Sequence, residues 1–222
     1  SIASKIAVIT VAIRLLHDNL SILSDDWVKA IFVLAVASMT LGNLVALTQN
    51  NAKRLLAYSS IAHSGYMMIG LALLPSGSNG IATGGSAIIF YLVGYAMMNL
   101  VAFSIIYIVK NKTGNYDITS LEGFGYASPI LGISLTIALI SLIGLPPTVG
   151  FMGKFYLFSV AIEHEMTWLV IIGVINSVVS SYYYLRIVKA LYSNKQQAYG
   201  NIPIIRGIPI IAILCTIGII VL

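Results

Sequence analysis

The sequence predicts an all-α fold: a polytopic bundle of about seven transmembrane helices, one of them discontinuous. Three observations lead to this prediction. Hydrophobic residues make up 59% of the chain and charged residues only 9%, whereas soluble domains carry about 25% charged residues. Apolar segments of roughly the 20 residues that cross a bilayer follow one another along the chain. Short polar stretches separate them, so we expect residues 1–222 to form one transmembrane domain.

The expected helices are separated by common helix breakers. They cover residues 1–17, 28–49, 53–74, 81–110, 128–164, 167–193 and 203–222. The breakers include Pro75–Gly80, Lys112–Asn115 and Asn194–Gln197. The first helix is short, and the chain shows neither an initiator Met nor the layout of a signal peptide. We therefore expect the chain to begin inside a helix, as a fragment, a split subunit or an incompletely represented protein.

The segment 128–164 is too long for one straight span and contains a strong helix breaker. Proline removes a backbone donor and clashes with the preceding turn of a helix. We therefore expect one helix in two halves, broken at 144–150. The residues of the break are Gly144, Pro146, Pro147 and Gly150.

Basic residues sort to one side when these helices alternate across a membrane. One side carries Lys53, Arg54, Lys110, Lys112, Arg186, Lys189, Lys195 and Arg206. The other side carries Arg14 and Lys29 beside the acidic residues Asp18, Asp25, Asp26, Glu163 and Glu165. Because excess Lys and Arg marks the cytoplasmic side, we expect the first side to face the cytoplasm or its organellar equivalent.

Two lysines fall on neither side. Lys154 lies about ten residues from Glu163, and Lys5 about twelve from His17, so a rise of about 1.5 Å per residue puts both near the middle of the membrane. A lysine at this depth is expensive unless it faces water or a partner. The alternative is that each long side chain extends to the membrane interface (snorkelling). This works for lysines near helix ends and is the weaker explanation for lysines near mid-span. We therefore interpret Lys154 and Lys5 as proton-relay candidates.

A polar band interrupts the third segment at central depth. It includes Tyr58, Ser59, Ser60, His63, Ser64 and Tyr66. An imidazole both donates and accepts protons, which suits a relay. The residues alone leave open a structural histidine that bonds to a neighbouring helix. Ser59, Ser60 and Tyr66 are candidates to support the relay.

A semi-polar stripe runs along the fourth segment. Tyr91, Tyr95, Asn99 and Tyr107 follow one another at spacings of 4, 4 and 8 residues. Helix packing with interhelical hydrogen bonds is the favoured interpretation. The alternative is support of a water chain, with Tyr95 and Asn99 as its candidates.

Other features favour structural interpretations. Lys53 is either an interfacial anchor or part of a proton entrance, and Tyr182–Arg186 is typical of an aromatic belt with a basic anchor. Gly42-Asn43, Gly65 and Gly70 indicate close helix packing rather than ligand binding. Glu163–Glu165 is expected to be a solvated turn, with a proton exit as the minority interpretation.

Composition excludes several classes of function. The net charge is +5, but no basic run is interleaved with aromatic residues, so we expect no nucleic-acid binding. The lone Cys215 and three widely spaced histidines provide neither a disulfide framework nor a common metal motif. We therefore expect no catalytic residue, metal site or redox cofactor in this chain.

Three stretches resemble the antiporter-like, proton-translocating membrane subunits of respiratory complex I. They are Gly42–Tyr66, Gly144–Phe158 and Tyr182–Val188. The first is similar to all antiporter-like subunits. The other two resemble the branch known as subunit N of NADH-quinone oxidoreductase, or subunit 2 in mitochondria. The resemblance covers nearly the whole chain and corresponds to the C-terminal half of such a subunit.

The resemblance implies the second of two inverted repeats, each with one discontinuous helix. It implies that Lys5 links two half-channels and that Lys154 lies near the proton outlet. It also implies a non-redox subunit of a proton-translocating NADH:quinone oxidoreductase, in a bacterial or archaeal cell membrane or the mitochondrial inner membrane. Expected partners are the missing N-terminal half, neighbouring antiporter-like subunits, lipid, and subunits that hold flavin, iron–sulfur centres and quinone.

Alternatives to this function remain open. One is a subunit of a multi-subunit sodium/proton antiporter, which would share the broken helix and Lys154. Another is a related dehydrogenase driven by reduced F420 or ferredoxin. A third is a scaffold of the membrane arm that conducts no protons.

Overall fold

The computed structural model describes residues 2–15, 24–74, 84–193 and 207–221. These residues are almost entirely helical, and no strand occurs among them, which confirms the all-α prediction. The elements are α1 (Ile2–Arg14), α2 (Ser24–Leu47), α3 (Ala52–Ala72), α4 (Gly84–Thr113), η3 (Ile118–Leu121), α5 (Phe124–Ala127), α6 (Pro129–Ile143), α7 (Val149–Glu163), α8 (Thr167–Leu191) and α9 (Gly207–Val221).

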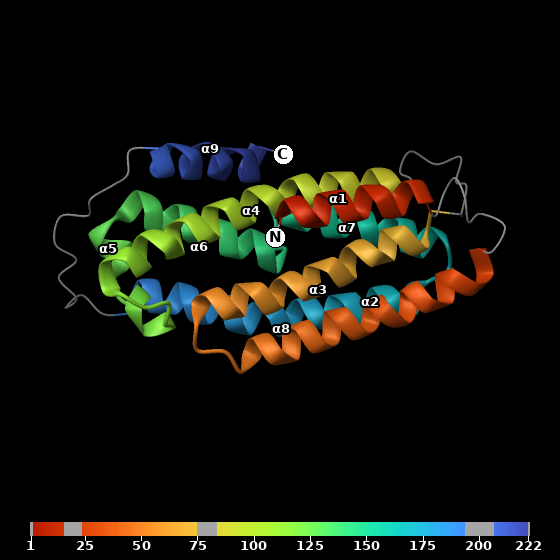
Figure 1. Cartoon of the computed structure of the whole chain (residues 1–222), viewed down its shortest axis with the longest axis horizontal. Coiled ribbons are helices and arrows are strands. Elements are labelled where there is room, and N and C mark those ends of the chain that lie inside the picture. Colours follow the sequence, from red (N-terminus) through yellow and green to blue (C-terminus); the bar gives the residue numbers. More distant parts are fainter. Residues whose placement is uncertain (1, 16–23, 75–83, 194–206, 222) are drawn as a thin grey trace.

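The helices lie roughly along one common axis (Figure 1). α4 is central and packs against α3, α6, α7 and α9, while α2 packs against α3 and α8. At about 1.5 Å per residue, the 30 residues of α4 extend about 45 Å, but the 15 residues each of α6 and α7 extend only about 22 Å. Because the hydrocarbon layer is about 30 Å thick, neither half-helix crosses it alone.

The expected helices are present, with shifted ends. α2 begins before residue 28, α4 continues past residue 110, and α9 is described only from Gly207. Residues 1, 16, 17, 81–83, 203–206 and 222 were also expected to be helical, but they lie outside the described residues. Residues 48–49, 73–74 and 192–193 are described and follow the ends of α2, α3 and α8. The short elements η3 and α5 were not expected. Leu121 and Phe124 are buried there, where η3 packs against α4 and α8, and α5 against α6 and α8.

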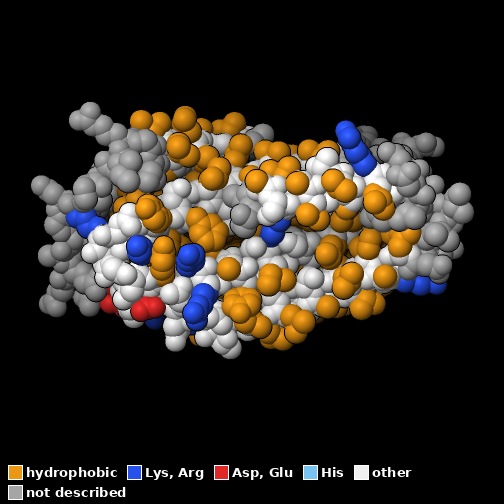
Figure 2. All heavy atoms as spheres, in the orientation of Figure 1, with side chains coloured by type: hydrophobic (Ala, Val, Ile, Leu, Met, Phe, Trp, Pro, Cys, Tyr) orange, Lys and Arg blue, Asp and Glu red, His pale blue; other side chains and the backbone are white. Residues whose placement is uncertain are grey.

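The outer surface of the bundle is apolar, as an integral membrane protein requires. Val33, Ile130 and Val178 are well exposed on three different helices. Figure 2 shows apolar side chains along the visible face, with most of the visible basic side chains near the end where α3 begins. Within the described ranges, three helical stretches are long and apolar enough to cross a membrane: Trp27–Leu47, Gly84–Thr113 and Thr167–Leu191. α3 is long enough, but its polar band lowers its hydropathy.

The two ends of the bundle carry the charges that the alternating topology predicts. At one end, the Ala52 amide donates to the Tyr116 carbonyl (2.8 Å), and Arg186 donates to the carbonyl of Gln49. These contacts join the start of α3, the segment after α4 and the last turns of α8. The basic residues described at this end are Lys53, Arg54, Lys110, Lys112, Arg186 and Lys189.

The opposite end contains the last turn of α1, the turn between α7 and α8, and the start of α2 (Figure 1). Arg14, Lys29, Glu163 and Glu165 belong to this end. Lys195, Arg206 and Asp18, and the side chains of Asp25 and Asp26, lie outside the described part of the chain. Which end faces the cytoplasm stays a prediction.

Candidate functional site

A row of buried and half-buried polar groups, all side chains except the backbone carbonyl of Ser60, connects five helices in the interior of the bundle. We call it the polar track. Its members are Lys5 on α1, Ser60, His63 and Tyr66 on α3, Tyr91 and Tyr95 on α4, Lys154 on α7, and Ser177 and Tyr184 on α8. The track runs from Lys5 to Lys154 and passes His63.

The interruption between α6 and α7 creates the setting for Lys154. α6 ends at Ile143, and Gly144 follows in the left-handed region with φ +89°. Pro146 and Pro147 lie in the exposed connection before α7. The predicted break is therefore confirmed, although Gly150 belongs to the first turn of α7 rather than to the break.

Gly150 brings the two half-helices together. Its amide donates to Ser141 Oγ over 3.1 Å. A Cβ at this position would collide with the backbone carbonyl of Ser141. Glycine is therefore the residue that lets the start of α7 pack against the last turn of α6.

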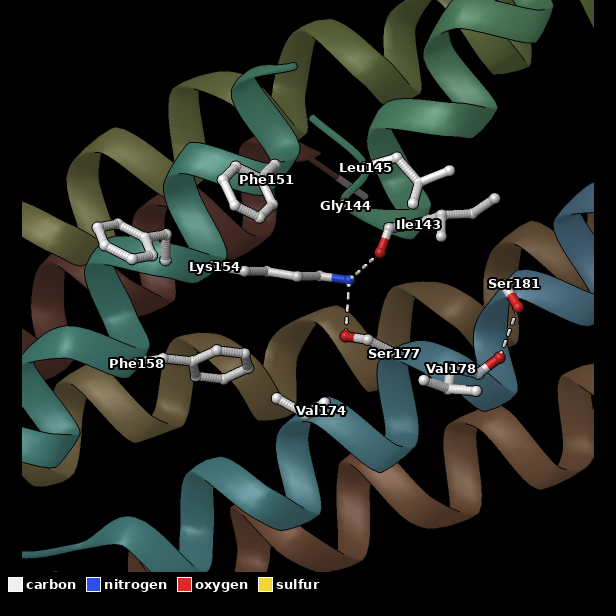
Figure 3. A pocket seen from close by; sticks show the side chains of 11 residues that line it. Ile143, Gly144, Leu145, Phe151, Lys154, Phe158, Val174, Ser177, Val178 and Ser181 are labelled. Atoms are coloured by element: carbon white, nitrogen blue, oxygen red, sulfur yellow. Dashed lines mark hydrogen bonds between the residues drawn. The ribbon is translucent and has the colours of Figure 1, made fainter. Parts of the chain in front are cut away.

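Lys154 belongs to α7, and its side chain caps the C-terminal end of the other half-helix, α6. Its ammonium donates to the carbonyls of Ile143 (2.7 Å) and Leu142 (3.3 Å), and to Ser177 Oγ (3.0 Å). The last carbonyls of a helix lack partners and form the negative end of its dipole, so a cation stabilises them. The side chain is only 5% exposed and points into the bundle, as Figure 3 shows, so Lys154 does not snorkel.

The remaining carbonyls of the last turn of α6 are also paired. The Gly144 amide donates to Ile140 (3.1 Å) and Ser141 (3.0 Å). Lys154 thus completes the cap that the backbone begins at Gly144. Loss of its side chain would leave two buried carbonyls without their donor.

Tyr66 extends the track from Lys154 towards α3. Its hydroxyl lies 3.1 Å from Ser177 Oγ and donates to the Gly173 carbonyl over 3.2 Å. The ammonium of Lys154 lies 4.8 Å from the centroid of the Tyr66 ring, within the range of a cation–π contact. The ring of Tyr66 therefore contacts Lys154 directly, and its hydroxyl is linked to Lys154 by way of Ser177.

His63 lies at the centre of the track and is 3% exposed. Its Nδ1 is 2.6 Å from the hydroxyl of Tyr91, and its Nε2 is 3.1 Å from that of Tyr184. The imidazole is therefore bonded to two neighbouring helices, as the structural interpretation expects. Its ring centroid also lies 5.1 Å from that of Tyr95 and 6.0 Å from that of Tyr66. Tyr95 contacts Lys5 and Tyr66 contacts Lys154, so His63 lies between the tyrosine partners of the two lysines.

Lys5 forms the other end of the track. Its ammonium donates to the carbonyl of Ser60 and, over 3.2 Å, to the hydroxyl of Tyr95. It also lies 4.8 Å from the centroid of the Tyr95 ring. The two lysines therefore have matching environments: each meets a backbone carbonyl, a hydroxyl and the face of a tyrosine.

The predicted supporting residues divide into two groups. Tyr66, Tyr95 and Ser60 belong to the track. Ser59 donates to the Leu56 carbonyl of its own helix (2.9 Å), and Asn99 donates to the Tyr95 carbonyl (2.9 Å).

Lys53 is exposed two turns before Ser60, at the end of the bundle, with its ammonium 5.1 Å from the Tyr116 ring centroid. Its entrance role stays a prediction. Glu163, the last residue of α7, and Glu165, in the turn that follows, are both exposed, as expected of a solvated turn.

The prediction of an aromatic belt at Tyr182–Arg186 was wrong for two of its tyrosines. Tyr183 and Tyr184 are 0% exposed, while Tyr182 is 65% exposed. Successive residues of a helix point about 100° apart, so a run of three tyrosines cannot share one face. Tyr184, predicted to lie at the membrane interface, is instead a member of the polar track. Arg186 donates to the α2–α3 turn instead of anchoring a belt.

The predicted stripe on α4 also ends earlier than expected. Tyr91, Tyr95 and Asn99 are buried, but Tyr107 is 46% exposed. Tyr107 follows Tyr91 by sixteen residues. At about 100° per residue this is four full turns plus about 160°, so the two side chains lie on nearly opposite faces of the helix. The hydroxyls of Tyr91 and Tyr95 make the interhelical bonds that the packing interpretation expects.

A second polar cluster lies beside the track. Asn43 Nδ2 donates to Asn176 Oδ1 (3.0 Å), and the Tyr183 hydroxyl donates to Asn43 Oδ1 (2.9 Å). We expected Asn43 to serve close packing only. The neighbouring Gly42 does so, since a Cβ there would lie 2.7 Å from the Ala62 amide nitrogen.

A cavity of about 350 Å³ adjoins Lys154 and Ser177. Its wall is mostly apolar and includes Leu145, Phe158, Val174 and Val178 (Figure 3). Lys154 and Ser177 contribute its polar groups. An apolar wall gives water few partners, so this volume does not by itself indicate a water chain.

The chemistry available in the track is proton exchange. It combines two amines, an imidazole and several hydroxyls, all of which can hold or pass a proton. Within the described ranges, no three or more His, Cys, Asp or Glu side chains are placed so that they could hold a metal ion. Ser177 and Asn176 had no distinguishing signal in the sequence, because α8 contains several similar polar residues.

Comparisons with known proteins identify similar sequences and structures. The family model described as "NADH:quinone oxidoreductase/Mrp antiporter, TM" matches residues 1–180. The chain is 45% identical over 193 residues to NADH-quinone oxidoreductase subunit N of Trichlorobacter lovleyi, covering 86% of this chain and 38% of the relative.

Two solved structures contain chains of similar fold. One belongs to respiratory complex I from Thermus thermophilus, with a TM-score of 0.74, 31% identity, and coverage of 86% of this chain and 42% of that one. The other belongs to an archaeal membrane-bound sulfane sulfur reductase, with a TM-score of 0.77, 30% identity, and coverage of 89% and 39%. The chain thus spans about two fifths of the length of each of these three proteins.

Proposed function

Because this chain belongs to the NADH:quinone oxidoreductase/Mrp antiporter transmembrane family, we propose that it is part of a proton-translocating membrane-arm subunit of a complex I-type NADH-quinone oxidoreductase. The observation that carries this proposal is the environment of Lys154. A buried amine at an interrupted helix lies in one row with a second amine, Lys5. Between them, ring contacts join His63 to Tyr66 on the Lys154 side and to Tyr95 on the Lys5 side. An ionisable group at such depth is a functional candidate in any membrane protein.

In the proposed mechanism, Lys5, His63 and Lys154 hold protons in turn. The ring of His63 lies beside the rings of Tyr66 and Tyr95, and each of these tyrosines contacts one of the two lysines. Because interactions between charges are strong in a buried, poorly polar environment, a proton gained by one group makes a proton on its neighbour less favourable. This electrostatic coupling would move charge along the track, while hydroxyls and water carry the proton between groups.

The proposed role in the enzyme complex is that of a non-redox subunit. Flavin, iron–sulfur centres and quinone would be held by partner subunits, which would supply the energy of electron transfer. Other antiporter-like subunits, the N-terminal half of the same subunit and lipid would surround this chain. The names of the complex I relatives support this assembly, and the sulfane sulfur reductase suggests that a similar module serves another respiratory complex.

Replacement of Lys154 tests the proposal directly. In closed membrane vesicles containing the complete complex, Lys154→Met should lower the number of protons pumped per NADH oxidised while NADH oxidation continues. The matched control is Lys29→Met, since Lys29 is exposed near one end of the bundle. Full pumping by the Lys154→Met complex would overturn the relay role and favour a scaffold.

Sodium/proton exchange is the second candidate function, because the family description also includes Mrp antiporters. The same vesicles distinguish the two. Proton movement driven by an imposed sodium gradient without NADH would favour the exchanger. Movement that requires NADH would favour the pump, and activity only with reduced F420 or ferredoxin would assign a different electron donor.

A further inference from the structure

Lys154 has one neighbour that can serve it in both protonation states. A charged lysine has three N–H donors and no acceptor. Its observed partners are the carbonyls of Leu142 and Ile143 and the hydroxyl of Ser177. When the amine loses a proton it gains a lone pair, and a backbone carbonyl cannot donate to it. Ser177 is the partner in this set that can both accept and donate.

The hydroxyl of Ser177 has a second partner that allows this reversal. Tyr66 Oη lies 3.1 Å from Ser177 Oγ, and either atom can be the donor. With Lys154 charged, the ammonium donates to Ser177, Ser177 donates to Tyr66, and Tyr66 donates to the Gly173 carbonyl. With Lys154 neutral, Ser177 donates to the amine and Tyr66 donates to Ser177.

We propose that Ser177 and Tyr66 form a reversible hydroxyl pair that keeps Lys154 hydrogen-bonded whether or not it carries a proton. The proposal rests on the relay function of Lys154. Ser177 acts as a positioning residue: it holds the amine in one place while the direction of two hydrogen bonds reverses. Hydroxyl protons rotate without movement of heavy atoms, so the exchange does not require repacking of α7 against α8.

Two features of the site favour this role. The ring of Tyr66 lies under the ammonium at 4.8 Å, so the hydroxyl and the ring of one residue both serve Lys154. The last turn of α6 is held by two hydrogen bonds. The Gly144 amide donates to the Ile140 carbonyl, and the Gly150 amide donates to Ser141 Oγ. The hydroxyl pair is therefore the adjustable part of a rigid setting.

Variants at Ser177, tested in the complete complex in closed membrane vesicles, measure the contribution of the hydroxyl. Ser177→Ala should lower the proton-pumping rate by roughly tenfold, the change in rate that one hydrogen bond of ordinary strength gives. Ser177→Thr retains the hydroxyl and should restore pumping. The matched control is Ser181→Ala, one turn further along the same cavity wall, whose hydroxyl donates to the Val178 carbonyl of its own helix (2.6 Å) (Figure 3).

Tyr66→Phe provides a second, independent variant, because it keeps the ring under Lys154 and removes only the hydroxyl. Residues that act through one chain of hydrogen bonds give non-additive effects. The Ser177→Ala/Tyr66→Phe double variant should therefore pump at nearly the rate of Ser177→Ala alone. Additive losses would overturn the pair, as would a Ser177→Ala complex that pumps like Ser181→Ala.

The Lys154→Met complex separates failure of this inference from failure of the proposed function. Loss of pumping in Lys154→Met with normal pumping in Ser177→Ala overturns the hydroxyl pair and leaves the relay intact. Normal pumping in both overturns both. If Ser177→Ala does not assemble, as judged by the amount of complex in the membrane, Tyr66→Phe against Tyr182→Phe decides the question.

Discussion

The ammonium of Lys154 donates to the carbonyl of Ile143 over 2.7 Å, so a lysine in one half-helix closes the end of the other. The interruption of the helix and the buried charge are therefore one feature. The broken end supplies the acceptors that a buried cation needs, and the cation supplies the donors that the broken end lacks.

Gly150 should be intolerant of any side chain. Gly150→Ala places a Cβ against the Ser141 carbonyl, and overpacking of this kind costs about 1–3 kcal/mol. Thermal unfolding of the purified complex should show the loss. Gly218→Ala is the control, because a Cβ there meets only the flexible side chain of Met97. Equal stability of the two variants would contradict the close contact between α6 and α7.

The hydroxyl of Tyr184 should matter more than that of its neighbour Tyr182. Tyr184→Phe removes the partner of His63 Nε2, and a buried polar group without a partner costs about 1–3 kcal/mol. We expect lower thermal stability and a lower ratio of protons pumped to NADH oxidised. Tyr182→Phe changes an exposed residue and should leave both unchanged. A Tyr184→Phe complex indistinguishable from Tyr182→Phe would argue against a role for this hydrogen bond.

Asn43 should be important for the docking of α2 against α8. Asn43→Ala removes both the donor to Asn176 and the acceptor for Tyr183. We expect a loss of stability of about 1–3 kcal/mol or more, since buried partners are left unpaired. Hydrogen exchange along α2 and α8 would locate the effect. Thr48→Ala is the comparison, as Thr48 donates to the Val45 carbonyl of its own helix at an exposed position; similar exchange in both would refute the prediction.

The Lys5–Tyr95 contact contains a ring component and a hydroxyl component that substitutions can separate. Tyr95→Phe keeps the ring near the ammonium and loses the hydrogen bond, whereas Tyr95→Leu loses both. A buried cation–π contact contributes up to about 2 kcal/mol. Pumping should therefore fall more in Tyr95→Leu than in Tyr95→Phe, while Tyr107→Leu, at an exposed position on the same helix, serves as control. Equal losses in the two Tyr95 variants would show that the ring contributes nothing.

Part of the site could be predicted because it depends on distance along one helix. The depth of Lys154 and Lys5 follows from counting residues to the nearest charged turn, and the break follows from Pro146 and Pro147. His63 stands out as a titratable residue in an apolar segment. Each of these signals lies within a single segment of the chain.

The rest could not be predicted because it depends on which faces of distant helices meet. Tyr184 contacts His63 across 121 positions in the sequence, and Ser177 contacts Lys154 across 23. A run of three tyrosines on a helix cannot point all of them the same way, but composition does not indicate which of them point inward. The same limitation applies to Asn43, which looked like a packing residue until α8 brought Asn176 and Tyr183 to it.

By itself, the sequence determined the all-helical membrane fold and the interrupted helix, and it predicted the depth of the two lysines, because hydropathy, proline and helical rise act locally. Only the tertiary structure decided which groups surround the ammonium of Lys154. It places the carbonyl end of α6, the hydroxyl of Ser177 and the ring of Tyr66 around the ammonium. The physical reason is that a buried cation is stabilised by the acceptors that surround it, and these come from three other helices.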